Sequence, residues 1–108
     1  LVYPDGRRAL DNVSLEGKIG QIVAFVGPTG AGKTSLAYLI PRYHVATEGE
    51  VLVDGYNVKN LTMTSLREQV TYVFQETQLF STTIFENIAY NKPETNADEV
   101  ERVARVAG

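Results

Sequence analysis

Gly27-Pro28-Thr29-Gly30-Ala31-Gly32-Lys33-Thr34 matches the pattern G-x-x-x-x-G-K-[ST] at every fixed position. Glycines at three positions allow the backbone angles with which several N–H groups curl around a polyphosphate. Lys33 adds a mobile cation for the β- and γ-phosphates, and the Thr34 hydroxyl can join the ligands of a Mg²⁺ ion. The stretch therefore predicts a phosphate loop that holds a nucleoside triphosphate.

A flexible glycine turn without a ligand is the alternative interpretation. Average residue frequencies place a chance match at about 1 in 250 chains of this length. The flanks also fit, because Gln21 to Val26 is the near-continuous apolar run of a strand buried on both faces of a parallel sheet. Lys33 to Ile40 has apolar residues at helical spacing and is stopped by Pro41. This context favours the phosphate loop.

The rest of the chain alternates between strand and helix patterns. Strands are predicted at Val13–Leu15, Glu50–Val53 and Val70–Phe74, and helices at Thr64–Gln69, Thr83–Tyr90 and from Asn96 onward. We expect Ser65 with Glu68 to form a capping box at one helix start, and Asn96 with Glu99 to form a cap at another. The alternation predicts the α/β class.

Composition excludes several classes of function. The chain has 108 residues with ten Lys+Arg and thirteen Asp+Glu, a net charge of −3, which argues against a general binder of nucleic acid or anionic membranes. It has no cysteine and one histidine, His44, so thiolate and multi-histidine metal sites are excluded. No apolar run approaches the roughly 20 residues of a membrane span. Because the start is neither an initiator methionine nor a signal peptide, we expect a piece of a longer protein.

Several further blocks occur in a fixed order around the loop. They are Tyr3–Gly6, Ala9–Leu15, Arg42-Tyr43, Glu48–Gly55, Leu66-Arg67, Val73–Gln75 and Leu79–Ile88. Together they resemble the first half of an ABC transporter nucleotide-binding domain, over about four fifths of the chain. The last block is similar to the form found in exporters with fused membrane and nucleotide domains.

The resemblance implies a partial P-loop NTPase fold. It would contain the phosphate-loop strand and helix with an antiparallel β subdomain, truncated before the helical subdomain. Residues 1–108 would form one partial ATP-binding domain with the adenine-contact region, the phosphate loop (Walker A) and the Q-loop, and no second domain. Two departures are Gly17, where the family usually carries an apolar residue, and the order Thr34-Ser35.

The resemblance also assigns roles to residues. Tyr3 would stack on adenine, Lys33 and Gln75 would act in catalysis, and Thr34 and Gln75 would hold Mg²⁺. The ATP-binding set would be Tyr3, Gly27, Thr29, Gly30, Ala31, Gly32, Lys33, Thr34 and Ser35. The structural alternatives are an ordinary tyrosine for Tyr3, an exposed strand-end glutamine for Gln75, and a plain helix-start hydroxyl for Ser35. His44 is interpreted as an ordinary surface residue.

The implied function is the ATP-binding part of a transporter ATPase that couples Mg·ATP binding and hydrolysis to export. Its partners would be a transmembrane domain of the same transporter and a second nucleotide-binding domain, head to tail, at the cytoplasmic face of a membrane. No Leu-Ser-Gly-Gly-Gln-like segment, no strand ending in paired acids and no switch histidine occur here. We therefore expect the isolated chain to bind nucleotide weakly or not at all, without turnover.

Two other functions remain open. A soluble or degenerate P-loop nucleotide-binding module without a transport role would also lack a membrane span. A P-loop kinase or GTPase is disfavoured, because Tyr3 and the block around Gln75 would then be coincidences. A preference for guanine over adenine would favour it.

Overall fold

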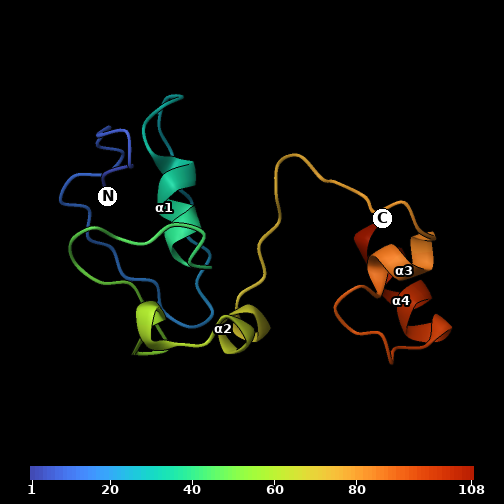
Figure 1. Ribbon diagram of the computed structural model, residues 1–108. Coiled ribbons are helices and arrows are strands. Elements are labelled where there is room, and N and C mark those ends of the chain that lie inside the picture. The colour runs from blue at the N-terminus through green and yellow to red at the C-terminus, as the bar shows by residue number, and fades with distance from the viewer. The chain divides into compact units, whose positions relative to one another are not determined.

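The computed structural model describes residues 1–108 as two compact units, Leu1–Val73 and Phe74–Gly108 (Figure 1). The first unit contains α1, a hairpin of β1 and β2, a 3-10 turn and α2, and the second contains α3 and α4. None of these helices has the length and apolar character that a membrane crossing requires.

The phosphate-loop helix predicted from the sequence is present as α1 (Lys33–Leu39). It ends where the Ile40 N–H binds the carbonyl of Ala37, directly before Pro41. Leu39 is buried, as are Val58 and Leu66 from later in the same unit. A small apolar core therefore supports the helix that follows the loop.

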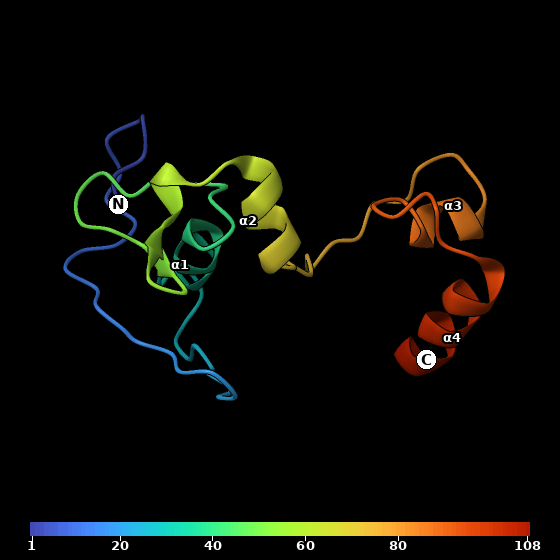
Figure 2. The ribbon, with the colours of Figure 1, turned by 90° about the horizontal axis from the view of Figure 1, so that it is seen from below.

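A short antiparallel hairpin follows α1 in the chain. β1 (Leu52–Val53) pairs with β2 (Tyr56–Asn57), with Leu52 opposite Asn57 and Val53 opposite Tyr56. Asp54 and Gly55 join them with φ angles of 50° and 81°, the left-handed pair that a tight hairpin turn requires. The predicted strand running into a tight turn is thus confirmed in its last two residues. Figure 2 shows the chain passing from this hairpin to α2.

The helix α2 (Met63–Gln69) confirms the predicted helix, but its cap differs from the prediction. Thr62 is the N-cap, and its side chain accepts a hydrogen bond from the Ser65 N–H at 3.2 Å. The predicted pairing of Ser65 with Glu68 is wrong because the helix begins earlier, at Met63. Thr62 lies three residues before Ser65, which is the spacing at which an N-cap side chain accepts from a backbone N–H of the first helical turn.

The second unit consists of two helices with polar caps. α3 (Ile84–Ile88) starts with a capping box between Thr83 and Glu86. α4 (Ala97–Ala107) has Asn96 as its N-cap, which accepts from the Glu99 N–H as the sequence predicted. The rings of Phe80 and Tyr90 stack with centroids 4.5 Å apart.

The predicted parallel strands are not formed. Residues 21–26 have no strand partner, and Ile22 and Val26 are 100% and 94% exposed. A strand buried on both faces needs neighbours for its N–H and C=O groups and apolar cover on each side. Residues 13–15 and 70–74 form no strand either, so these neighbours are missing. Helices and strands both occur, but the sheet is an antiparallel pair.

Candidate nucleotide site

The phosphate loop is closed by its own lysine. The Lys33 Nζ donates to the carbonyl oxygens of Gly27 and Pro28, both at 2.7 Å. Within the loop, the Ala31 N–H donates to the Pro28 carbonyl at 3.2 Å. The ammonium group therefore lies against the start of the loop, and α1 begins at the same residue. A cation is thus placed where the loop backbone curls.

Two glycines fix the curvature of this loop. Gly30 and Gly32 have φ angles of +83° and +85°, a region that glycine adopts without the strain other residues meet. A Cβ atom on Gly32 would lie 2.6 Å from the carbonyl oxygen of Ala9 and 2.9 Å from Leu10. A Cβ on Gly30 would meet no atom within 4 Å. Gly32 is therefore required for close packing as well as for backbone angle.

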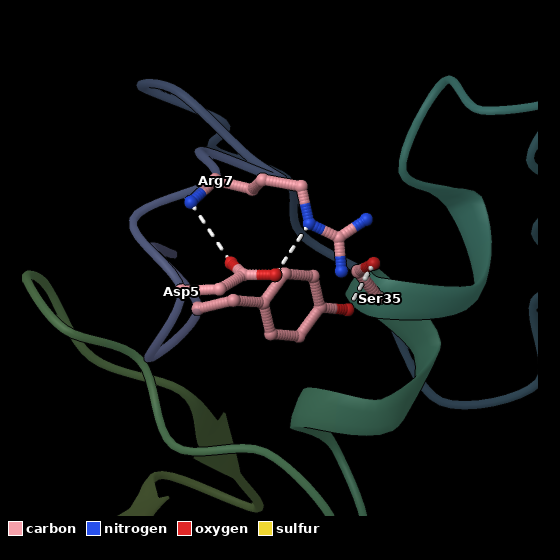
Figure 3. A network of polar contacts seen from close by, with 4 residues as sticks. Asp5, Arg7 and Ser35 are labelled. Atoms are coloured by element: carbon pink, nitrogen blue, oxygen red, sulfur yellow. Dashed lines mark hydrogen bonds and ion pairs between the residues drawn. The ribbon is translucent and has the colours of Figure 1, made fainter.

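Tyr3 and Ser35, both predicted to contact nucleotide, are brought together. Their hydroxyl oxygens lie 2.8 Å apart, and Ser35 is the third residue of α1 (Figure 3). The Arg7 guanidinium carbon lies 5.5 Å from the centroid of the Tyr3 ring, within cation–π range. The Tyr3 ring also makes an edge contact with His44, at 5.2 Å between centroids. No motif in the sequence indicated a role for Arg7.

An acidic residue holds Arg7 in this network. Asp5 accepts from the Arg7 backbone N–H at 3.0 Å and from its Nε at 2.7 Å. Both hydrogen bonds hold the pKa of Asp5 below its usual value, and the bond from the backbone N–H has the larger effect. The bond to Nε orients the guanidinium over the ring.

The two residues predicted to hold Mg²⁺ lie in different units. Thr34 follows Lys33 in α1, is exposed, and its hydroxyl makes no hydrogen bond within the chain. Gln75 belongs to the second unit, where its side chain is exposed and also has no hydrogen-bond partner. A hydroxyl and an amide oxygen are hard donors that suit Mg²⁺. Each group is therefore a possible ligand in its own unit. No group of three or more acidic or histidine side chains is arranged to hold a metal ion.

A cavity opens beside the loop in the first unit. Its volume is about 350 Å³, within the range of small-molecule pockets. Its wall combines residues of the loop and of α1 with apolar residues from earlier in the chain: Leu10, Val13, Ala24, Phe25, Val26, Ala31, Gly32, Lys33 and Leu36. Lys33 is its one charged wall residue. Space of ligand size therefore adjoins the phosphate loop.

Aromatic side chains from α1 and from later in the first unit form a second cluster that the sequence did not predict. The rings of Tyr38, Tyr43 and Tyr72 lie 5.4–5.7 Å apart by centroid, and His44 lies 5.5 Å from Tyr38. The pKa of Tyr72 is raised mainly by desolvation and to a smaller extent by the two neighbouring tyrosines. His44, interpreted from the sequence as a surface residue, is half-buried between two rings. No local sequence pattern predicts these contacts, because Tyr72 is distant in sequence from Tyr38 and Tyr43.

A glycine loop with its lysine at the start of a helix is the arrangement of P-loop nucleotide-binding proteins. Residues 10–107 match the family model described as ABC transporter. The chain therefore belongs to the ABC transporter family, and its resemblance to the exporter-type nucleotide-binding domain is confirmed. A P-loop NTPase fold follows from that membership.

Similar proteins include named transporters. An ATP-dependent lipid A-core flippase of Methylococcus capsulatus is 48% identical over 109 residues, which is 99% of this chain and 18% of that protein. A fatty acid ABC transporter ATP-binding/permease protein of Mycobacterium bovis is 42% identical over 105 residues, 97% of this chain and 17% of that protein. An uncharacterized ABC transporter ATP-binding protein of Bacillus subtilis is 40% identical over 105 residues, which is 97% of this chain and 18% of that protein. The chain spans less than a fifth of the length of these relatives.

Proposed function

We propose that these residues are the ATP-binding part of a transporter ATPase that couples Mg·ATP binding and hydrolysis to export across a membrane. The observation that carries the proposal is the Lys33 ammonium group, held 2.7 Å from two carbonyls of the glycine loop. Phosphate oxygens accept hydrogen bonds from an ammonium more strongly than neutral carbonyls do, because both partners are then charged. In this proposal, Lys33 exchanges the loop carbonyls for phosphate oxygens when a nucleotide binds.

Each predicted site residue has a role in this proposal. Lys33 binds the β- and γ-phosphates, while the backbone N–H groups of residues 27–32 and the Ser35 hydroxyl bind the remaining phosphate oxygens. The Tyr3 ring stacks on adenine, since an aromatic face suits a purine. Gln75 orients the attacking water through its amide.

The proposal includes a magnesium ion, for which the chain offers two hard oxygen donors. Thr34 would hold it through its hydroxyl and Gln75 through its amide oxygen, and neither group is used elsewhere in the chain. When bound, the ion supplies charge neutralisation at the β- and γ-phosphates. The residues of the chain orient the phosphates and the water.

The remaining parts of the proposal concern the whole protein. We propose that the chain works with a transmembrane domain of the same transporter and with a second nucleotide-binding domain, at the cytoplasmic face of the membrane. Two relatives named as a flippase and as an ATP-binding/permease protein support a link to a membrane domain. The signature segment and the paired acids needed for turnover are not among these 108 residues, so we expect the isolated chain not to hydrolyse ATP.

The proposal is tested by ATP titration and ATPase assay on the full-length protein. Lys33→Ala should abolish turnover and weaken ATP binding. Lys18→Ala is the matched control, because Lys18 lies in the preceding loop and its ammonium makes no contact. Equal ATP binding by the two variants and the unaltered protein would overturn the proposal. Robust turnover by the isolated chain would contradict the expected need for additional segments.

A soluble module without a transport role is distinguished by the coding sequence around these residues. Apolar spans upstream, with a signature segment and paired acids downstream, support the transporter. A short reading frame that lacks all of them supports the nucleotide-binding module. A preference for GTP over ATP would instead favour the kinase or GTPase class.

A further inference from the structure

Arg7 covers the ring that the proposed function assigns to adenine. Its guanidinium carbon is 5.5 Å from the Tyr3 ring centroid, and its Nε is bound to Asp5 at 2.7 Å (Figure 3). The Arg7 side chain is 77% exposed, and the Asp5 side chain is 53% exposed. Ion pairs this exposed are weak. The guanidinium is therefore oriented by the pair but free to lift from the ring.

Most of the hydrogen-bonding capacity of Arg7 is unused. A guanidinium has five N–H donors, and Nε alone has a partner in the chain. Neither terminal nitrogen has a hydrogen-bond partner within the chain. A planar, weakly hydrated cation with free donors can stack on an aromatic face and bond to polar edges.

The ring and the arginine are attached to the phosphate-loop helix. The Tyr3 hydroxyl is bonded to Ser35, which lies two residues after Lys33 in α1. The N-terminal turn is itself closed by hydrogen bonds from Tyr3 N–H to the Arg7 carbonyl and from Gly6 N–H to the Tyr3 carbonyl. The Tyr3–Arg7 pair of the N-terminal turn is thus joined through Ser35 to the helix that carries Lys33, where the phosphates of a nucleotide would lie.

We propose that Arg7 is a base-binding residue of this site and that its guanidinium plane covers the face of the base opposite Tyr3. The inference rests on the proposed function and adds the second wall of the base site. Guanidinium planes stack on bases much as aromatic rings do, without regard to base identity. The existing cation–π contact opens by a side-chain rotation, and the base enters between the two groups.

Titration of ATP and of inorganic tripolyphosphate into the full-length protein tests this role. Arg7→Ala should weaken ATP binding about five-fold and leave tripolyphosphate binding unchanged, since only ATP has a base. Arg7→Lys should stay near Arg7→Ala, because the ammonium lacks the plane. Arg8→Ala is the matched control: it removes the same charge from the next residue, whose guanidinium pairs with Asp11 at 2.8 Å.

Each result has a defined meaning. Equal ATP affinities for Arg7→Ala, Arg8→Ala and the unaltered protein would overturn the role of Arg7 and leave the proposed function standing. An equal loss for ATP and tripolyphosphate would place Arg7 on the phosphates and overturn the assignment to the base. Unaltered protein that binds neither probe, or binding that Lys33→Ala leaves intact, would overturn the proposed function and this inference together.

Discussion

The hydroxyl oxygens of Tyr3 and Ser35 lie 2.8 Å apart and join two parts of the chain that are 32 residues apart in sequence. One belongs to the N-terminal turn, and the other lies on the first turn of α1. The bond is partly buried. It sets the ring of Tyr3 beside the phosphate-loop helix, so that one side chain links the predicted base site with the predicted phosphate site.

Tyr3→Phe removes this hydroxyl and keeps the ring. We expect the free energy of unfolding to fall by about 0.5–1.5 kcal/mol, the usual contribution of one intramolecular hydrogen bond. ATP affinity should fall less than in Tyr3→Ala, because the stacking face remains. Urea denaturation and ATP titration measure the two effects. Ser35→Ala should cause a similar loss of stability, and the double variant little more; fully additive losses would show that the bond contributes nothing.

Gly32→Ala should destabilise the chain more than Gly30→Ala. Both glycines have positive φ, so both substitutions incur left-handed strain of about 1–2 kcal/mol. Only at position 32 does the new Cβ also meet the Ala9 carbonyl, at 2.6 Å. Thermal unfolding of the two variants compares them directly. Equal melting temperatures would show that the N-terminal segment can move away from the loop without loss of stability.

Local features were predicted well from the sequence. The glycine loop, α1, the hairpin turn at Asp54-Gly55 and the Asn96 cap all depend on residues within a few positions of one another. Backbone angles and capping hydrogen bonds are fixed by such neighbours. The one local error, the cap of α2, arose because Thr62 and Ser65 both have hydroxyls and only the start of the helix decides between them.

Contacts between distant residues were not predictable in the same way. The apolar run at 21–26 has the pattern of a buried strand, but a strand forms only when its neighbours are in place. Likewise, Arg7 over Tyr3 and His44 beside the same ring follow from how the N-terminal turn meets α1. The candidate site was therefore predicted as a set of residues, while its arrangement required the structure.

Arg42 is expected to stabilise the first unit more than the nearby Lys59. Its Nη1 donates to the carbonyls of Val58 and Leu61, both at 2.6 Å and partly buried. Hydrogen bonds to a charged group contribute about 1.5–3 kcal/mol, so Arg42→Ala should lower the free energy of unfolding by an amount of that order. Lys59→Ala is the control, since its single bond, to the Ala46 carbonyl, is exposed. Equal urea midpoints for Arg42→Ala and Lys59→Ala would contradict the larger contribution that we expect from Arg42.

The capping box of α3 should make stability depend on pH. The Glu86 carboxylate accepts from the Thr83 N–H at 3.0 Å and from its hydroxyl at 3.1 Å. These two bonds lower the pKa of Glu86 below its ordinary value of 4.5, and the bond from the backbone N–H has the larger effect. A folded-state pKa below the unfolded value means that the stabilisation is complete above about pH 4.5 and is lost as the pH falls through the folded-state pKa.

Glu86→Gln isolates this effect, because a glutamine can keep the bond from the Thr83 N–H and cannot ionise. We expect the unaltered protein to be more stable than Glu86→Gln at pH 7 and the difference to shrink as the pH falls below 4. Asp5 and Glu99, whose pKa values are also lowered, are present in both proteins, so their contributions cancel in the comparison. Urea unfolding at pH 7 and pH 3, with carbon-13 NMR titration of the Glu86 carboxyl, measures both quantities. A stability difference that is the same at the two pH values, or a titration midpoint above 4.5, would show that the carboxylate is not held by Thr83.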